Sequence, residues 1–124
     1  LREEMIETVV KPWGTEIKWA HTAQYVGKVL EIKPNERLSI QYHNEKVETM
    51  LVINGSGVVH FYTMDEDGDV RASSGKTLNV NDVVHITAKQ IHSIEAGAEG
   101  LTIVEVSTNH LKDLVRIQDK YNRS

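Results

Sequence analysis

Residues 34–55 read PNERLSIQYHNEKVETMLVING, and this stretch decides the fold. Side chains alternate across a β-strand, so Gln41 and His43 share one face, with Cα atoms roughly 7 Å apart. Glu48 opens the next expected strand after a turn, and His92 falls in a third. An amide, two imidazoles and a carboxylate on strand faces need polar partners, which one divalent metal would supply. Hydrogen-bonded or exposed histidines are the alternative, and spacing alone favours that alternative.

Outward from this stretch, short β-rich runs alternate with turn signals, the pattern of a sandwich or barrel. Residues 49–62 read as a hairpin with its turn at 54–57, and 65–69 read as an exposed acidic turn. Apolar residues at helical spacing predict a short helix from about 109 to 121. Further strands are expected at 28–33, 38–43, 77–80, 83–86, 91–95 and 101–107. The prediction is an all-β barrel, one domain over 1–124, with a short C-terminal helix or helical turn.

The composition bounds the classes of function. A net charge of −4 over 124 residues gives no electrostatic reason to bind nucleic acid or an anionic membrane. No apolar run approaches the ~20 residues of a membrane span, and residues 1–11 mix charges into their apolar positions, unlike a signal peptide. The chain has no cysteine for a disulfide or thiolate site. We therefore expect a cytoplasmic protein that binds neither nucleic acid nor a membrane.

Several segments resemble one known family, in the same order along the chain. The stretch at 34–55 is similar to the first cupin motif in its phosphomannose isomerase form, which has a Ser-Leu-Gln-x-His core followed by Arg-x-Glu. Residues 81–96 resemble the second cupin motif, with His92 at its metal position. Other matching segments lie at 11–14 (KPWG), 25–32, 104–106 and 113–123. The chain thus resembles the cupin domain of the type II mannose-6-phosphate isomerase (phosphomannose isomerase) family.

The resemblance implies a cupin (jelly-roll) β-barrel with one divalent metal. Zinc is the first expectation, and manganese, nickel, cobalt or iron would suit the same side chains. Its ligands would be Gln41, His43, Glu48 and His92.

The resemblance also implies an aldose–ketose isomerase that converts mannose 6-phosphate to fructose 6-phosphate. The phosphate would be held by Lys28, Lys46 and Arg116. The family's counterpart of Arg116 closes over the site. Glu105 is the candidate catalytic base for this reaction by its strand parity, which it shares with Leu101 and Ile103. In many relatives this domain is fused to a nucleotidyltransferase.

Alternate residues of a strand point to the same face, and this strand parity predicts where the charged side chains lie. Lys28 and Glu105 have the parity of apolar neighbours on their strands, so both are expected to point into the barrel. Lys46 has the parity of Glu48 and is expected to reach the same cavity. The alternatives are a lysine that snorkels out at the rim and a glutamate that only forms a buried ion pair.

Some departures from the family pattern affect only turns, whereas others affect the expected substrate and metal. Asn35, Asn81 and Asn122 stand where glycine is usual, and asparagine tolerates the left-handed backbone that such turns require. Lys46 stands in an arginine position and lacks the planar fork that grips a phosphate at two points. Gln41 replaces the first imidazole of many cupin oxygenases.

Two other classes of function therefore stay open. One is another metal-dependent cupin enzyme, an oxygenase or a sugar-modifying enzyme. The other is a non-catalytic module that binds a sugar phosphate or a nucleotide sugar. We also expect a homodimer, because residues 6–19 contain both tryptophans and an edge strand that needs cover. The remaining histidines are expected to be structural or exposed: His21, His60, His85 and His110.

Overall fold

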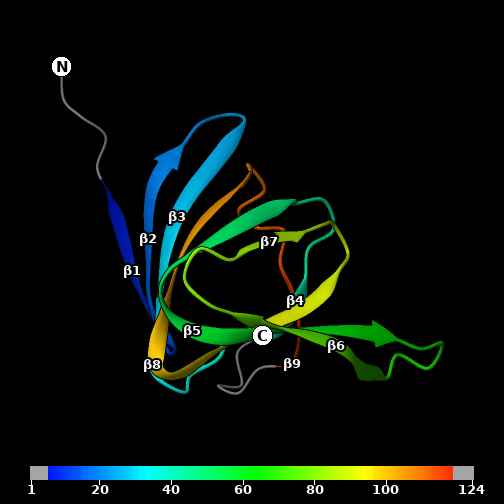
Figure 1. Ribbon diagram of the computed structural model, residues 1–124. Coiled ribbons are helices and arrows are strands. Elements are labelled where there is room, and N and C mark those ends of the chain that lie inside the picture. Colours follow the sequence, from blue (N-terminus) through cyan, green and yellow to red (C-terminus); the bar gives the residue numbers. More distant parts are fainter. Residues whose placement is uncertain (1–5, 119–124) are drawn as a thin grey trace.

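In the computed structural model, residues 6–118 are described, and they form nine β-strands and no helix (Figure 1). No helix in this part of the chain could therefore cross a membrane. The strands are β1 (Glu7–Lys11), β2 (Gly14–His21), β3 (Tyr25–Ile32), β4 (Ile40–Tyr42), β5 (Glu48–Met64), β6 (Val70–Leu78), β7 (Val83–Ile86), β8 (Ile91–Thr108) and β9 (Val115–Gln118).

The long strands β5 and β8 pair antiparallel along most of their length and link two halves of a curled sheet. In one half, residues 48–55 of β5 pair with 101–107 of β8, and the strand order is β1-β2-β3-β8-β5-β7. In the other, residues 57–62 of β5 pair with 91–96 of β8, and the order is β9-β4-β8-β5-β6. The two halves curl around one core, which confirms the all-β expectation.

The predicted hairpin at 49–62 is wrong, because β5 runs through the expected turn as one strand of 17 residues. The glycines bend the strand instead of reversing it. Gly55, which pairs with Leu101 on β8, has φ 79°, and the adjacent Gly100 has φ 82°. A Cβ on Gly55 would lie 2.1 Å from the Gly100 carbonyl oxygen, so the two backbones meet where no side chain fits. Strand pairing on both sides of the bend keeps the chain running in one direction.

The predicted helix at 109–121 is also wrong over the described residues. Residues 115–118 form β9, which pairs with β4 through Gln41↔Arg116 and Tyr42↔Val115. Tertiary pairing with an open strand edge overrides a weak helical pattern here. Tyr121, the last apolar position of that pattern, lies outside the described residues.

The remaining features are one expected strand, the acidic turn and the asparagines expected to have left-handed backbone. The strand expected at 77–80 is only the end of β6, which begins at Val70; its residues 71–77 are exposed and lack an apolar alternation. The acidic turn joins β5 to β6 as predicted. Asn35 and Asn81 adopt φ 62° and 78°, the left-handed backbone expected of them. Asn122 lies outside the described residues.

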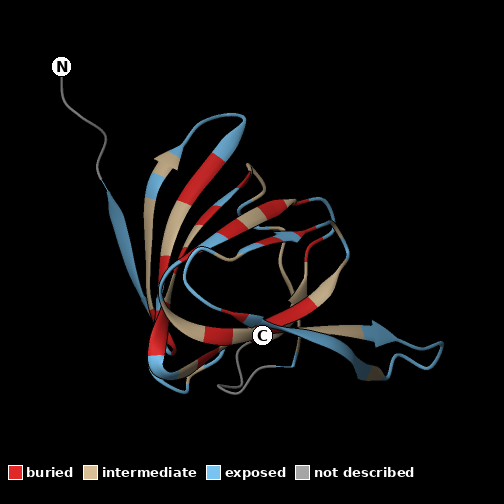
Figure 2. Cartoon of the chain, in the orientation of Figure 1, coloured by how far each residue is buried: buried red, intermediate tan, exposed pale blue. Residues whose placement is uncertain are grey.

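The core fills the inside of the barrel with the inward side chains of alternate strand positions (Figure 2). Its members come from β3, β5, β6, β7 and β8, with Trp13 in the turn between β1 and β2. Towards one end of the barrel the buried positions become polar, namely His43, Lys46, Glu48, His92, Glu105 and Ser107. This change of character marks the place where a site can form.

We expect Gly55→Ala to destabilise the fold more than Gly68→Ala. Both glycines have a positive φ, so each alanine costs about 1–2 kcal/mol of backbone strain. Only Gly55 faces backbone atoms, whereas a Cβ on Gly68 meets nothing within 4 Å, so Gly55→Ala should lose roughly 2 kcal/mol more. Urea unfolding measures the free energies. Equal losses would contradict the close approach of β5 and β8.

Candidate metal and substrate site

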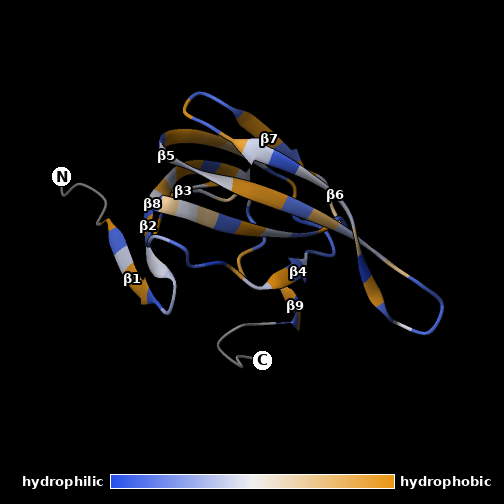
Figure 3. Ribbon diagram, turned by 60° about the horizontal axis from the view of Figure 1, so that its bottom comes forward, coloured by the Kyte–Doolittle hydropathy of each residue, from blue (hydrophilic) through white to orange (hydrophobic). Residues whose placement is uncertain are grey.

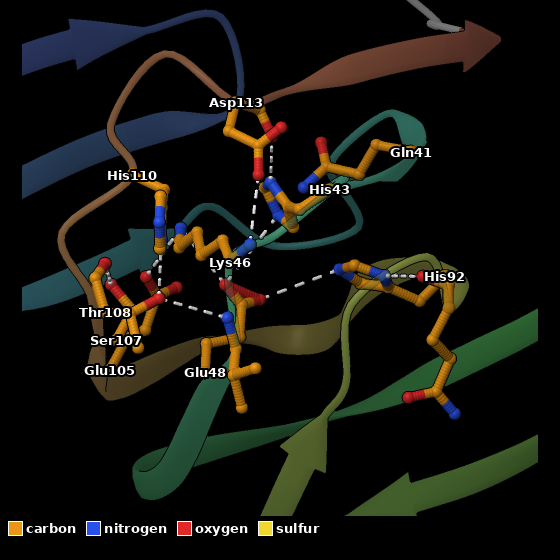
Figure 4. Close-up of polar contacts among 12 residues, drawn as sticks. Gln41, His43, Lys46, Glu48, His92, Glu105, Ser107, Thr108, His110 and Asp113 are labelled. Atoms are coloured by element: carbon orange, nitrogen blue, oxygen red, sulfur yellow. Dashed lines mark hydrogen bonds and ion pairs between the residues drawn. The ribbon is translucent and has the colours of Figure 1, made fainter.

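Three buried side chains from different segments converge on one point: His43 after β4, Glu48 at the start of β5, and His92 in β8 (Figure 4). One ligand atom from each lies within 4.8 Å of the others. The Nε2 atom of His43 is 3.8 Å from Glu48 Oε2, and that of His92 is 3.7 Å from Glu48 Oε1. These separations are too long for hydrogen bonds and suit atoms that share an ion at ~2.0–2.2 Å.

Backbone carbonyls fix both imidazoles in the orientation that a metal requires. His43 Nδ1 donates to the Asp113 carbonyl at 2.8 Å, and His92 Nδ1 donates to the Gln90 carbonyl at 2.9 Å. A carbonyl only accepts, so each ring carries its proton on Nδ1 and presents a lone pair on Nε2. Both Nε2 atoms are buried and have no hydrogen-bond partner among the described residues. Two orphaned nitrogen lone pairs beside a carboxylate are a donor set that fits a divalent metal.

Electrostatics keep the first of these imidazoles neutral. Burial, and then the nearby charge of Lys46, lower the pKa of His43 to about 4. Near neutral pH the ring is therefore uncharged, which is the form that binds a metal.

Gln41, the fourth expected ligand, lies beside this cluster. It pairs with His92 in the β4–β8 ladder and lines the same cavity. Its Oε1 accepts a hydrogen bond from Ser39 Oγ at 2.7 Å. The strand pairing thus brings Gln41 to the ligands, while its coordination stays a prediction.

A line of paired charges continues from Glu48 away from the histidines. Lys46 Nζ lies 3.1 Å from Glu48 Oε2 and 3.3 Å from Glu105 Oε2. Lys28 stands opposite Glu105 in the β3–β8 register, and its Nζ is 3.2 Å from Glu16 Oε2. All of these residues line one cavity. Lys28 and Glu105 do so by strand parity as expected, whereas Lys46 reaches the cavity from the segment between β4 and β5.

The two central charges shift each other's titration. Burial lowers the pKa of Lys46, but the charges of Glu105 and Glu48 outweigh this and hold the pKa above its usual value. Burial, followed by the charge of Glu48, raises the pKa of Glu105. The protonated form of Glu105 is therefore more favoured than that of an exposed glutamate.

Asp113 is a structural partner that the sequence argument missed. Its carboxylate accepts the backbone N–H groups of Asn44 at 3.0 Å, Glu45 at 2.6 Å and Lys46 at 3.0 Å, while its carbonyl accepts from His43. These bonds, the one from Glu45 foremost, lower the pKa of Asp113 to about 2. The available signal was its place in the 113–123 segment, which resembles a segment of the family.

The cavity has a volume of about 160 Å³ and is open at one end of the barrel. Arg116, carried by β9 next to Gln41, lines its wall as expected. Lys11 and Glu16 from the β1–β2 hairpin also line it, and the sequence argument did not include them. The histidines expected to be structural or exposed lie outside the cavity: His21, His60, His85 and His110.

Comparison with known proteins identifies the family of this chain. Residues 2–119 match the family described as "Mannose-6-phosphate isomerase C-terminal". The chain belongs to this family. Mannose-1-phosphate guanylyltransferase of Escherichia coli (strain K12) is 32% identical over 119 residues, which cover 93% of the chain and 23% of the relative. The chain thus spans about a quarter of the length of the curated relatives it matches.

Solved structures agree on the fold. CapF, a capsular polysaccharide assembling protein from Staphylococcus aureus, superposes with a TM-score of 0.72 at 20% identity, over 94% of this chain and 32% of that one. Oxalate decarboxylase from Lactobacillus farciminis, in a formate complex, gives 0.72 at 17% identity, over 90% and 34%. Both contain cupin folds, so the jelly-roll class is confirmed.

Replacing His92 by alanine should abolish stoichiometric metal binding by this cupin while the barrel stays folded. The reason is that the variant keeps only one of the two oriented Nε2 atoms. Metal content after dialysis, measured by plasma mass spectrometry, checks this, with circular dichroism for the fold. His60→Ala is the matched control, because His60 pairs with Glu95 outside the cavity. Full occupancy in the His92 variant would show that the ligand set is wrong.

Asp113→Asn should weaken zinc binding roughly ten- to a hundredfold without unfolding the domain, because Asp113 orients the segment that carries His43. An asparagine has one acceptor oxygen for N–H groups that now use two. Competition with a chromophoric chelator measures the affinity. Asp82→Asn is the control, since Asp82 accepts the Asn79 N–H away from the cavity. Identical zinc affinities for the two variants would rule out this positioning role.

Proposed function

We propose that this cupin is a metal-dependent aldose–ketose isomerase of a hexose phosphate, converting mannose 6-phosphate to fructose 6-phosphate. One observation carries the proposal. The His43–Glu48–His92 cluster and the buried carboxyl group of Glu105 share one cavity, with cationic side chains on its wall. Isomerisation between an aldose and a ketose needs these three elements: polarisation of a carbonyl, a group that moves a proton, and charge for the phosphate.

The metal would be held by His43, Glu48 and His92, with Gln41 as the fourth ligand. When bound, it would supply a Lewis acid that polarises the substrate carbonyl. Zinc is the first choice for two imidazoles and a carboxylate, and manganese, nickel, cobalt or iron suit the same donors.

Glu105 is the proposed base. Its carboxylate would take the proton from the carbon next to the substrate carbonyl and return it to the neighbouring carbon. The raised pKa of Glu105 serves this task, because a group that both accepts and returns a proton works best when its pKa is near the working pH. The cavity wall around it includes apolar side chains such as Leu30 and Met50, which limit access of water.

Lys46 takes a different role from that of its arginine counterpart. Because its ammonium group lies between Glu48 and Glu105, we propose that it holds both carboxylates apart and in place. Lys28 and Arg116 line the cavity and are then the proposed phosphate binders. Arg116 is also the proposed catalytic residue that closes over the substrate. A phosphate on Lys28 would compete with Glu16, the present partner of that lysine.

The proposal concerns the cupin site alone. Guanylyl transfer is named for relatives of which this chain matches about a quarter, and it is not assigned to the cavity. A single cupin domain over 1–124, a cytoplasmic location and a homodimer complete the proposal.

A coupled assay for fructose 6-phosphate formed from mannose 6-phosphate tests the function directly. The zinc- or manganese-loaded chain should turn over, and the chelated chain should not. Oxygen consumption with no fructose 6-phosphate would favour an oxygenase. Binding of mannose 6-phosphate without turnover would favour a non-catalytic module.

Glu105→Gln should lower kcat by about 10²–10⁴-fold, because the amide cannot accept the proton. Metal content should stay at the wild-type level, since Glu105 lies behind Lys46 and outside the ligand cluster. Steady-state kinetics and metal analysis check both parts. Glu95→Gln, which removes a carboxylate paired with His60 outside the cavity, is the control. Wild-type kcat in Glu105→Gln would remove this residue from the chemistry.

A further inference from the structure

A groove lies on the outside of the sheet half that contains β9, β4, β8, β5 and β6. One hollow there has a volume of about 190 Å³, and a wider one beside it has about 580 Å³. Ile40, Tyr62 and Gln118 line both hollows, which are therefore continuous, and we call the two together the outer groove. In Figure 3 the β5–β6 hairpin extends away from the barrel, and β4 and β9 lie side by side. The size is that of a small-molecule site, ~300–1,000 Å³.

Strand parity separates the outer groove from the metal cavity. On β8, His92 and Ile94 point inward, to the metal cluster and the core, so Ser93 and Glu95 point outward. His60 on β5 pairs with Ser93 and shares its side of the sheet. Ser93 is buried and also lines the metal cavity, so it belongs to the wall between the two. The outer groove is thus a second site on the other side of the same sheet.

Polar side chains in the outer groove hold one another in place. The Tyr62 hydroxyl and Ser93 Oγ are hydrogen-bonded at 3.0 Å. His60 Nε2 lies 3.0 Å from Glu95 Oε1, and both side chains of this pair remain partly exposed. The carboxylate of Glu95 has a second oxygen that can accept a hydrogen bond from a ligand. Because these groups are already ordered, a ligand that binds them pays little entropy to fix them.

The charges along the outer groove balance. Arg37 and Glu95 line its narrower hollow and stand opposite each other in an isolated β-bridge, and Arg71 and Asp69 line the wider one. An ion bound there would meet like charge as well as opposite charge, so the groove does not favour a phosphate. Donors and acceptors side by side match a neutral molecule rich in hydroxyl groups, because each hydroxyl both donates and accepts.

Tyr62 supplies the apolar contact that such a ligand also needs. The half-buried ring lies where the two hollows join, and its hydrogen bond to Ser93 fixes its direction. Leu38 and Ile40, also half-buried, add aliphatic surface beside it. A sugar ring has C–H groups on its face and hydroxyl groups around its edge. It can therefore pack on an aromatic ring while the edge meets polar side chains.

We propose that the outer groove binds a neutral oligosaccharide, with one sugar ring on Tyr62 and its hydroxyl groups on His60 and Glu95. A chain of sugars fits better than a single one, because the groove continues from Tyr62 along the start of β6. The site goes beyond the proposed isomerase function: it lies on the other side of the sheet, and its ligand carries no phosphate.

Binding of the full chain to an array of neutral and anionic oligosaccharides tests this proposal, followed by calorimetry with the neutral trisaccharide bound best. Tyr62→Ala should weaken binding at least about tenfold, because the ring is lost, and Tyr62→Phe should weaken it less. Glu95→Ala should weaken it roughly two- to tenfold through a lost hydrogen bond. Thr63→Ala, at an exposed neighbour of Tyr62 outside the groove, is the matched control. Circular dichroism and zinc content should be unchanged, since none of these residues lines the metal cavity.

The proposal is overturned if no neutral oligosaccharide binds at millimolar concentration, or if only anionic ones do. It is also overturned if a folded Tyr62→Ala or Glu95→Ala variant binds like the wild type, because the ligand would then lie elsewhere. An excess of mannose 6-phosphate should leave the oligosaccharide bound, and displacement would place the ligand in the barrel cavity instead. None of these measurements uses isomerase activity, so this proposal and the proposed function can fail separately.

Discussion

The close approach of Gly55 and Gly100 is the constraint on which the barrel depends. Strands β5 and β8 must bend at the same level, and they do so where Gly55 has no Cβ that would collide with the Gly100 carbonyl. On either side of the bend the two strands keep pairing, so each contributes to both halves of the sheet. Glu48 and Glu105 lie on one side of the bend and His92 on the other. The bend thus turns two long strands into a concave wall that gathers the site.

Several polar groups are buried at one end of the barrel, and their charges are not balanced among themselves. Two carboxylates, Glu48 and Glu105, share a single ammonium group between them. Removing one partner from such a buried set typically costs 3–5 kcal/mol, so the arrangement is costly unless it is complete. The neighbouring imidazoles add lone pairs and no protons toward Glu48. A metal cation at this point would balance the charge of the second carboxylate and accept both imidazole lone pairs. The buried cluster is therefore better explained by a metal site than by ordinary core packing.

How much could be predicted from the sequence differs between the site and the fold. The cluster at His43, Glu48 and His92 was expected from the resemblance to the cupin motifs, whereas spacing alone favoured ordinary histidines. Strand parity placed Lys28 and Glu105 correctly, because a period of two is a strict geometric rule, but Lys46 reaches the cavity from the segment before β5, where that rule does not apply. The bend at 54–57 and the strand β9 were wrong, because glycine-rich turns and short apolar patterns take their meaning from the strand they pair with. Asp113 escaped notice for a related reason. Its bonds go to backbone N–H groups, and no sequence pattern records those partners.

The C-terminal half of β8, LTIVEVST at 101–108, shows how one strand serves both the core and the site. Side chains alternate between the two sides of a strand, so Leu101, Ile103 and Glu105 point the same way. Leu101 and Ile103 are buried in the core, and the proposed base Glu105 continues their row into the cavity. Lys28 on β3 and Met50 on β5 pair with Glu105 from either side, which fixes the level at which its carboxylate stands. The strand that fills the core therefore also holds the proposed base in position.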